Sequence, residues 1–213
     1  MSKLISGTGD TSNPVQDYIG YFEGFVMRQL DATERHKISL ENALEQCKNS
    51  LILIGTTLHS VRNQLPKLII KEKVSLPKFR ELSLVLRDPR AKDVSKNITR
   101  HLKEFMSDES VIELLELNGS DPKIFIYICE DFVRYSATYI DHLEDFGKIR
   151  ITHSIYGSLM EHAPSYLLTR KKSTILYDNF VKAWDDLKSR KGTTRISSPK
   201  DFHAFINKVK KNQ

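Results

Sequence analysis

The 213-residue chain is poor in cysteine, proline and glycine, and each shortage excludes a class of protein. Its two cysteines, Cys47 and Cys129, are too few for the disulfide framework of a small secreted domain, so a reducing cytoplasmic setting is expected. Seven prolines and nine glycines are too few for a collagen-like fibre or a proline-rich linker. Hydrophobic residues make up 39% of the chain, which is enough for a buried core.

Long apolar runs are also missing. A membrane-spanning helix needs about 20 apolar residues in succession, whereas the runs at 51–54 and 124–129 are far shorter. Residues 1–13 are polar and rich in glycine, serine and threonine, so a flexible N-terminus without a secretory signal is expected. The sequence therefore predicts a cytoplasmic protein, with peripheral membrane association as an option.

Local patterns of catalytic or metal-binding residues are absent from the sequence. The seven histidines are scattered, and none is placed with cysteine or histidine partners at the spacing of a zinc site. Cys129 precedes Glu130 and Asp131, which should raise the pKa of its thiol and make it a poor nucleophile. We therefore expect a non-catalytic protein without a cofactor or metal, although a site assembled from distant residues would leave no local pattern.

Charge is distributed in blocks, although the net charge of the whole chain is only +6. The net charge is −2 over residues 1–61, +8 over 62–103, −8 over 104–165 and +8 over 166–213. The acidic block can neutralise one of its basic neighbours, but the other basic block remains in excess. This pattern predicts an anionic partner, which is a phospholipid surface, a nucleic acid or an acidic protein.

Helical signals dominate the first part of the chain. Asn13 and Pro14 form a capping pair, and no further proline occurs before Pro66. Apolar residues in the second half of this stretch follow one another at alternating steps of four and three, which is the spacing of a coiled-coil seam. The seam comprises Leu40, Leu44, Cys47, Leu51, Ile54, Leu58, Val61 and Leu65. The sequence thus predicts a long helix over 14–65 whose seam binds a partner helix or a second copy of the chain.

The rest of the chain is also predicted to be helical. Prolines divide the basic segment 66–118 into short helices, and a capping signal at Ser120 to Pro122 begins a long kinked helix over 121–190. The β-branched run at 124–129 is compatible with a strand, but its place directly after that capping signal favours a helix. A short helix is predicted over 199–211. The predicted fold class is all-α: one domain over 14–213, built as an elongated bundle of long antiparallel helices with coiled-coil-like packing.

Residues 130–191 resemble the second helix of BAR-type domains, which are crescent-shaped helical dimers that bind curved membranes. The resemblance depends on apolar residues at helical spacing around the kinking Pro164, followed by the basic run Arg170 to Lys172. It implies a homodimer whose basic tips bind lipid phosphates. Two features depart from the family: the interposed segment 66–118 and the short final helix over 199–211.

The leading functional hypothesis is a helical adaptor or scaffold that dimerises through its seam and docks on anionic membranes. The predicted lipid- or phosphate-binding residues are Arg170, Lys171, Lys172, Lys188, Arg190, Lys191, Arg195 and Lys200. The predicted seam contacts are Leu40, Leu44, Leu51, Ile54, Leu58 and Val61. One alternative is a nucleic-acid-binding protein that contacts phosphates through the basic blocks 62–103 and 166–213. The other is a pure protein–protein interaction module.

Overall fold

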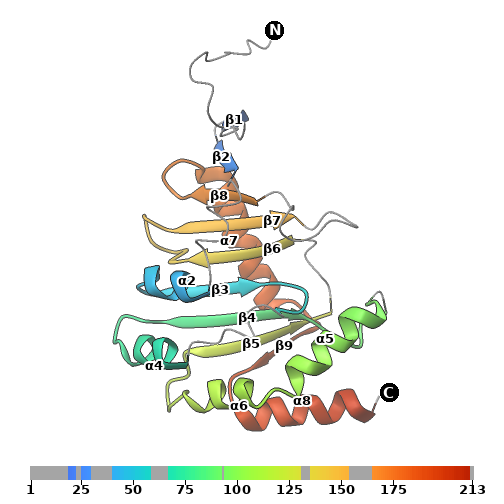
Figure 1. The fold of residues 1–213 in the computed structure, drawn as a ribbon. Coiled ribbons are helices and arrows are strands. Elements are labelled where there is room, and N and C mark those ends of the chain that lie inside the picture. The colour runs from blue at the N-terminus through green and yellow to red at the C-terminus, as the bar shows by residue number, and fades with distance from the viewer. Residues whose placement is uncertain are drawn as a thin grey trace, which may run out of the picture.

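The chain folds as a mixed α/β protein in which helices pack on both faces of a single large sheet (Figure 1). This description comes from a computed structural model that describes residues 19–22, 25–29, 40–58, 67–92, 94–130, 135–153 and 165–211. The predicted all-α bundle is therefore wrong. The predicted flexible segment 1–13 lies outside the described residues.

The sheet has nine strands in the order β1-β2-β8-β7-β6-β3-β4-β5-β9. At its centre β3, β4 and β5 are mutually parallel, and the remaining neighbours pair antiparallel. The strands are β1 (Ile19–Phe22), β2 (Phe25–Gln29), β3 (Ser50–Ile54), β4 (Glu81–Arg87), β5 (Ile124–Cys129), β6 (Tyr135–Ile140), β7 (Lys148–His153), β8 (Ser165–Thr169) and β9 (Thr193–Ile196).

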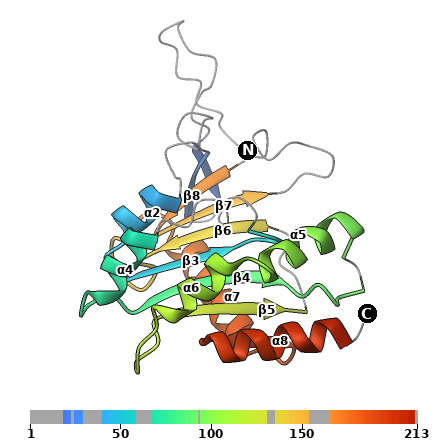
Figure 2. The same cartoon turned by 60° about the horizontal axis from the view of Figure 1, so that its bottom comes forward.

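The sheet separates two hydrophobic cores, and helices cover the core on each face. The helices are α2 (Leu40–Gln46), α4 (Lys67–Ser75), α5 (Lys96–Met106), α6 (Glu109–Glu116), α7 (Thr174–Ser189) and α8 (Pro199–Lys211). Side chains of α2, α4, α5, α6 and α8 pack in the first core, whereas α7 packs in the second through Tyr177, Trp184 and Leu187. A second view shows α5, α6 and α8 on one side of the sheet and α7 behind it (Figure 2).

Strand β5 is the segment 124–129 that the capping signal had suggested to be helical. Ile124, Ile126 and Ile128 point into the first core, and the alternate residues Phe125 and Tyr127 point into the second. A central parallel strand is covered on both faces, so its sequence is apolar throughout and lacks the alternation of a half-exposed strand. The polar residues before it form a turn, because the Asn118 side chain accepts hydrogen bonds from the N–H groups of the two residues 123 and 124.

The predicted long helix over 14–65 is also wrong, because its seam is divided between a helix and a strand. Leu40 begins α2 and Leu44 lies within it, whereas Leu51 and Ile54 belong to β3. Leu44 and Leu51 are fully buried in the first core and Ile54 is buried in the second, so none of them is available to a partner helix. Beyond β3, Leu58 takes a positive φ of 46° that no α-helix contains. Val61 lies outside the described residues.

The structure contradicts the resemblance to BAR-type domains. The predicted helix over 121–190 contains β5, β6, β7 and β8 before it reaches α7, so it is not one kinked helix. The shorter helices are present: α4, α5 and α6 lie within 66–118, and α8 spans residues 199–211. Within the described part of the chain, no helix combines the length and apolarity that crossing a bilayer requires.

Candidate nucleic-acid interface

The carboxyl ends of β3, β4 and β5 lie at one edge of the sheet, because these strands are parallel. Ligands of open α/β sheets bind preferentially outside this edge. The chain leaves β4 at Arg87 and enters α5 at Lys96, so α5 begins at the same edge. Figures 1 and 2 both show the beginning of α5 and the end of α8 on this side of the molecule.

A buried ion pair fixes the connection between β4 and α5. The Asp88 side chain is 1% exposed and accepts hydrogen bonds from the Arg90 backbone and guanidinium, the shortest joining Nη2 to Oδ2 at 2.6 Å. These bonds raise the pKa of Arg90 above its usual value. The Arg90 guanidinium lies 5.2 Å from the ring centroid of Phe205 on α8. This contact joins the loop to α8, and the Arg90 side chain remains 30% exposed at the edge.

Helix α5 turns a basic face outward. Leu102 and Phe105 are buried against the first core, whereas Lys96, Arg100 and Lys103 are exposed. The first turn contains no acidic residue, although the helix macrodipole favours negative charge there by about 0.3–1 kcal/mol per group. Lys96 is therefore unfavourable for the stability of α5. Arg100 makes two exposed contacts on its own helix: its Nη2 donates a hydrogen bond to Asn97 Oδ1 at 2.9 Å, and its Nε lies 3.9 Å from a Glu104 carboxylate oxygen.

Helix α8 adds positive charge from a different part of the sequence. Its buried face packs Phe202, Phe205 and Val209 against the first core. Lys208, Lys210 and Lys211 follow in its last turn, where cations complement the macrodipole. Lysines in the last turn are common in helices, so these three do not by themselves indicate a binding site. Their significance comes from their position beside the basic start of α5.

The loop between α7 and β9 brings two more cations to this edge. Strand β9 runs antiparallel to β5 and pairs Thr193 with Cys129, so the preceding Arg190 and Lys191 lie beyond the carboxyl end of β5. Gly192 has a φ of +96°, and a Cβ there would lie 2.9 Å from a Glu130 carboxylate oxygen. Glycine is therefore needed for this close turn.

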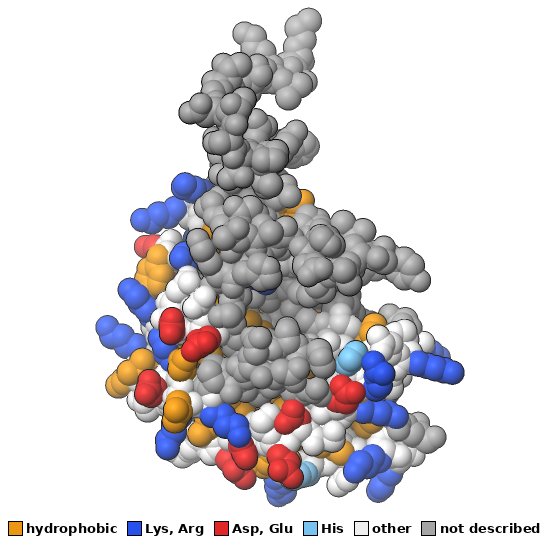
Figure 3. Space-filling view, in the orientation of Figure 1, with side chains coloured by type: hydrophobic (Ala, Val, Ile, Leu, Met, Phe, Trp, Pro, Cys, Tyr) orange, Lys and Arg blue, Asp and Glu red, His pale blue; other side chains and the backbone are white. Residues whose placement is uncertain are grey.

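We call the resulting set of exposed cations the carboxyl-edge surface. It comprises Lys92, Lys96, Arg100, Arg190, Lys191, Lys208, Lys210 and Lys211. Arg90 is not included, because Asp88 already pairs with its guanidinium. The residues of this surface come from both basic blocks of the sequence, 62–103 and 166–213. In the space-filling view, Lys and Arg side chains project on the side of the molecule where α5 begins and also on the opposite side, with acidic side chains between them (Figure 3).

The predicted lipid-binding residues do not form one cluster. Thr169 at the end of β8 pairs with Lys148, so the following Arg170, Lys171 and Lys172 lie at the amino edge of the central strands. The 16 residues of α7, about 24 Å of helix, separate them from the carboxyl-edge surface.

The remaining predicted residues are also dispersed. Lys188 pairs with Asp185 at 2.7 Å and lies over the Trp184 ring, so its charge is already engaged. The Arg195 guanidinium stacks 4.1 Å from the ring centroid of Phe125 on the sheet. Lys200 lies at the start of α8, at the other end of that helix from the last-turn lysines.

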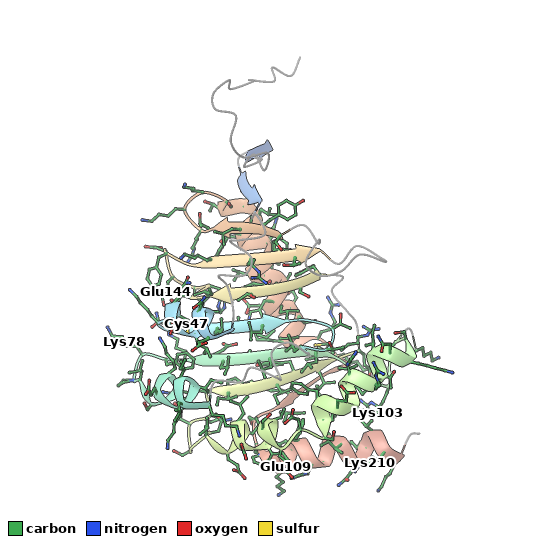
Figure 4. All side chains as sticks on the ribbon, in the orientation of Figure 1. Cys47, Lys78, Lys103, Glu109, Glu144 and Lys210 are labelled. Carbon is green, nitrogen blue, oxygen red and sulfur yellow. The ribbon has the colours of Figure 1, made fainter. Side chains whose placement is uncertain are left out.

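Sequence reasoning missed Lys96, Arg100, Lys103 and Lys210 as individual residues. The excess of positive charge over 62–103 was visible, but only the fold shows which of those cations meet the end of α8. Figure 4 shows Lys103 and Lys210 around the junction of α5, α6 and α8, with Cys47, Lys78 and Glu144 at the opposite edge of the sheet.

The amino edge is braced by buried polar groups. The Asp141 carboxylate is 1% exposed and accepts hydrogen bonds from the backbone N–H groups of residues 48, 49 and 50. Beside it, Nδ1 of the buried His142 lies 3.2 Å from the Ser50 hydroxyl. Burial lowers the pKa of His142 to about 4, which keeps the ring neutral at physiological pH. These contacts hold the turn before β3 against the turn after β6.

Both cysteine thiols are buried and weakly acidic. Burial raises the pKa of Cys47 to about 11, and it raises the pKa of Cys129 as well. The expectation of a poorly nucleophilic Cys129 is thus confirmed in direction, although the main cause is burial rather than the adjacent carboxylates. Among the described residues, no group of three or more His, Cys, Asp and Glu side chains is placed to hold a metal ion.

The chain matches no known protein family, and no curated protein is similar to it in sequence. One solved structure similar to it is that of TrmBL2, an archaeal chromatin protein that shows a novel mode of DNA binding. The two chains are 10% identical, and their alignment has a TM-score of 0.44 and covers 83% of this chain. It covers 54% of TrmBL2, so this chain spans about half the length of that protein. A similarity this distant leaves the functional argument to the residues described above.

Proposed function

We propose that the protein binds nucleic acid, with the carboxyl-edge surface contacting the phosphate backbone. The observation that supports this most strongly is the convergence of cations from four separate segments on one edge of the sheet. Binding of lysine and arginine to phosphates releases condensed counterions, which is the main source of affinity in sequence-independent binding. A row of exposed cations at the favoured ligand edge of an α/β sheet suits that role.

The charge at the start of α5 strengthens the proposal. Cations at the end of α8 help to stabilise that helix and need no further reason. Lys96 has the opposite effect on α5, since it lies at the positive end of the helix macrodipole. Binding an anion would account for an exposed charge that is unfavourable for the stability of its own helix.

The test is the salt dependence of oligonucleotide binding, measured by fluorescence anisotropy between 50 and 200 mM salt. We expect the affinity to fall at least about tenfold over this range, because several phosphates are contacted. The triple variant K96E/R100E/K210E should lose at least about 100-fold in affinity at the lower salt concentration. K96E favours α5, whereas K210E removes a favourable cation from the end of α8. Circular dichroism and thermal unfolding of the triple variant therefore check that the loss does not come from unfolding.

The matched control carries the same kind of charge change at the amino edge, in the double variant K171E/K172E. Both lysines are exposed and belong to the basic block 166–213. We expect this variant to keep oligonucleotide affinity within about threefold of the wild type, since α7 separates it from the binding surface. A salt slope near zero, or an equal loss in the two variants, would overturn the proposal.

A second candidate function concerns the amino edge, where one observation favours contact with anionic membranes. Leu143, Phe146 and Ile175 are 52%, 50% and 60% exposed. The Arg170 guanidinium donates a hydrogen bond to the Leu143 carbonyl at 2.6 Å, so the basic run 170–172 lies directly beside them. We call these six residues the amino-edge patch. Exposed apolar side chains flanked by cations are typical of surfaces that enter the headgroup region of a bilayer.

Co-sedimentation with vesicles tests this candidate. Vesicles that contain phosphatidylserine should retain the wild type, and vesicles of phosphatidylcholine alone should not. The variant L143S/F146S/I175S should lose binding while keeping its oligonucleotide affinity. Absence of wild-type binding to the anionic vesicles would remove the membrane candidate and leave the nucleic-acid proposal untouched.

A further inference from the structure

A groove with a volume of about 990 Å³ lies between α5 and α8, with the start of α6 at one end. Its floor is aliphatic and comprises Val94, Met106, Ile112, Ile206 and Val209. Four cations also line it, Lys96, Arg100 and Lys103 from α5 and Lys210 from α8, and all four are exposed. Figure 4 labels Lys103, Glu109 and Lys210 at this junction.

Binding of duplex phosphates requires the cations but makes no use of an apolar floor. In a duplex the bases are stacked inside and only their edges reach the grooves. A single strand exposes its bases, which bind in apolar or stacking pockets while the phosphates remain on cations. The combination of aliphatic floor and lining cations therefore matches a strand whose bases are unpaired.

The polar residues of the groove fit the same ligand. His203 and Asn207 line it from α8, and Thr99 lines it from α5. An imidazole ring stacks on bases, and amide and hydroxyl groups hydrogen-bond to base edges. Glu104 and Glu109 lie toward the α6 end, where carboxylates repel phosphates but accept hydrogen bonds from base amino groups.

We infer that this groove binds the unpaired bases of a single-stranded nucleic acid, with the phosphates lying along Lys96, Arg100 and Lys210. The inference rests on the proposed nucleic-acid function and adds the class of strand that is bound. The phosphates follow the basic start of α5 and the end of α8, whereas the bases point toward the aliphatic floor. The protein then prefers single strands to duplexes of equal length.

The experiment compares labelled 12-mers of oligo(dT) and oligo(rU) with a 12-base-pair duplex, by anisotropy at one salt concentration. Wild-type protein should bind at least one of the single strands about tenfold more tightly than the duplex. The neutral variant Ile206→Ser removes part of the floor without changing any charge. It should weaken single-strand binding about tenfold, because a base loses part of its apolar contact with the floor, and leave duplex binding within about twofold.

Ile69→Ser is the matched control, because Ile69 is another partly buried isoleucine packed on the first core, but in α4. It should leave both affinities unchanged. Asn207→Ala tests the groove without touching the core, since Asn207 is exposed, and should weaken only single-strand binding. A second measurement, photo-crosslinking of a 4-thiouridine-labelled strand, should map to α5 and α8 peptides.

The possible results distinguish a failure of the groove inference from a failure of the proposed nucleic-acid function. Equal affinity for single and double strands, with no effect of Ile206→Ser, would overturn the groove inference and leave the phosphate surface standing. Crosslinks confined to other elements would overturn it as well. Failure of the wild type to bind any of the three oligonucleotides would overturn the proposed function itself.

Discussion

Both ends of the central parallel strands carry cations, but the residues that surround those cations differ between the two edges. At the amino edge, Arg170, Lys171 and Lys172 lie beside exposed apolar side chains, over a framework of buried polar groups around Asp141. At the carboxyl edge, the cations of α5 and α8 surround an aliphatic groove and include charges that disfavour their own helix. Positive charge alone therefore does not specify a partner. The side chains that surround the cations distinguish the two edges.

The largest expected effect comes from removing the buried carboxylate of the amino edge. Asp141→Ala leaves three backbone N–H groups without their acceptor and places alanine at a φ of 48°. We expect a loss of about 4 kcal/mol in the free energy of unfolding, measured by urea denaturation. Asp141→Asn keeps one acceptor and tolerates that φ, so it should recover about half. A loss below about 1 kcal/mol in the alanine variant would show that Asp141 does not brace this edge.

His142 should make the stability of the fold depend on pH through the amino edge. Its folded pKa of about 4 lies below the ordinary value of 6.5, so the unfolded chain takes up the proton first. The stabilisation is complete above pH 6.5 and is lost as the pH falls from 6.5 toward 4, by about 3 kcal/mol.

The control for this pH dependence is His142→Gln, which lacks the titrating group. Carboxylates also titrate below about pH 5, so the difference between wild type and variant isolates the histidine. Urea unfolding at pH 7, 5.5 and 4.5 should show the wild type losing more stability than the variant at each step. Parallel pH profiles of the two proteins would contradict a buried neutral His142.

A smaller effect is expected at the carboxyl edge, where Asp88 holds Arg90. In Asp88→Asn the buried side chain can no longer neutralise the guanidinium, and we expect a loss of about 2 kcal/mol in unfolding free energy. Oligonucleotide affinity should rise about twofold, because Arg90 is then released to the phosphates. Lower stability together with higher affinity distinguishes this edge from the amino edge. A fall in affinity would mean that the pair positions Arg90 for binding.

The smallest effect concerns the loop that carries Arg190 and Lys191. Gly192→Ala should cost about 1 kcal/mol, because φ at this position is +96° and a Cβ meets the Glu130 carboxylate. Glu130→Ala in the same chain relieves the contact but not the backbone strain, so most of the loss should remain. Full recovery in the double variant would assign the cost to the contact alone. Thermal unfolding measures both variants.

Capping signals in the sequence were reliable only in part: the helix predicted over 199–211 is present, whereas the signal at Ser120 to Pro122 precedes strand β5. Asp108 accepts a hydrogen bond from the Ser110 N–H, and Ser198 accepts one from the Asp201 N–H, as expected of N-caps. The strands were not predictable, because β3 and β5 are buried on both faces and show no period of two. Residues 44, 51 and 54 then matched a heptad only because a short helix and a short strand follow one another at that spacing.

The sequence showed that the site is basic, but it did not show which lysines and arginines form it. The basic blocks 62–103 and 166–213 were identified from charge alone. The direction of each strand decides which cations meet: the parallel β4 delivers the start of α5 to the carboxyl edge, and the antiparallel β9 delivers Arg190 there. The same rule sends Arg170 to the opposite edge. No local pattern encodes these directions, because they are set by pairings between distant strands.

The division of the groove between α5 and α8 has a kinetic consequence. Arg100 and Lys210 are separated by roughly 110 residues, and contacts so distant in sequence form late because the loop between them must first be closed. A chain that has ordered only its α5 region presents three of the four cations that line the groove, and no groove. Binding in the groove therefore requires the contact between α5 and α8, which forms only once that loop is closed.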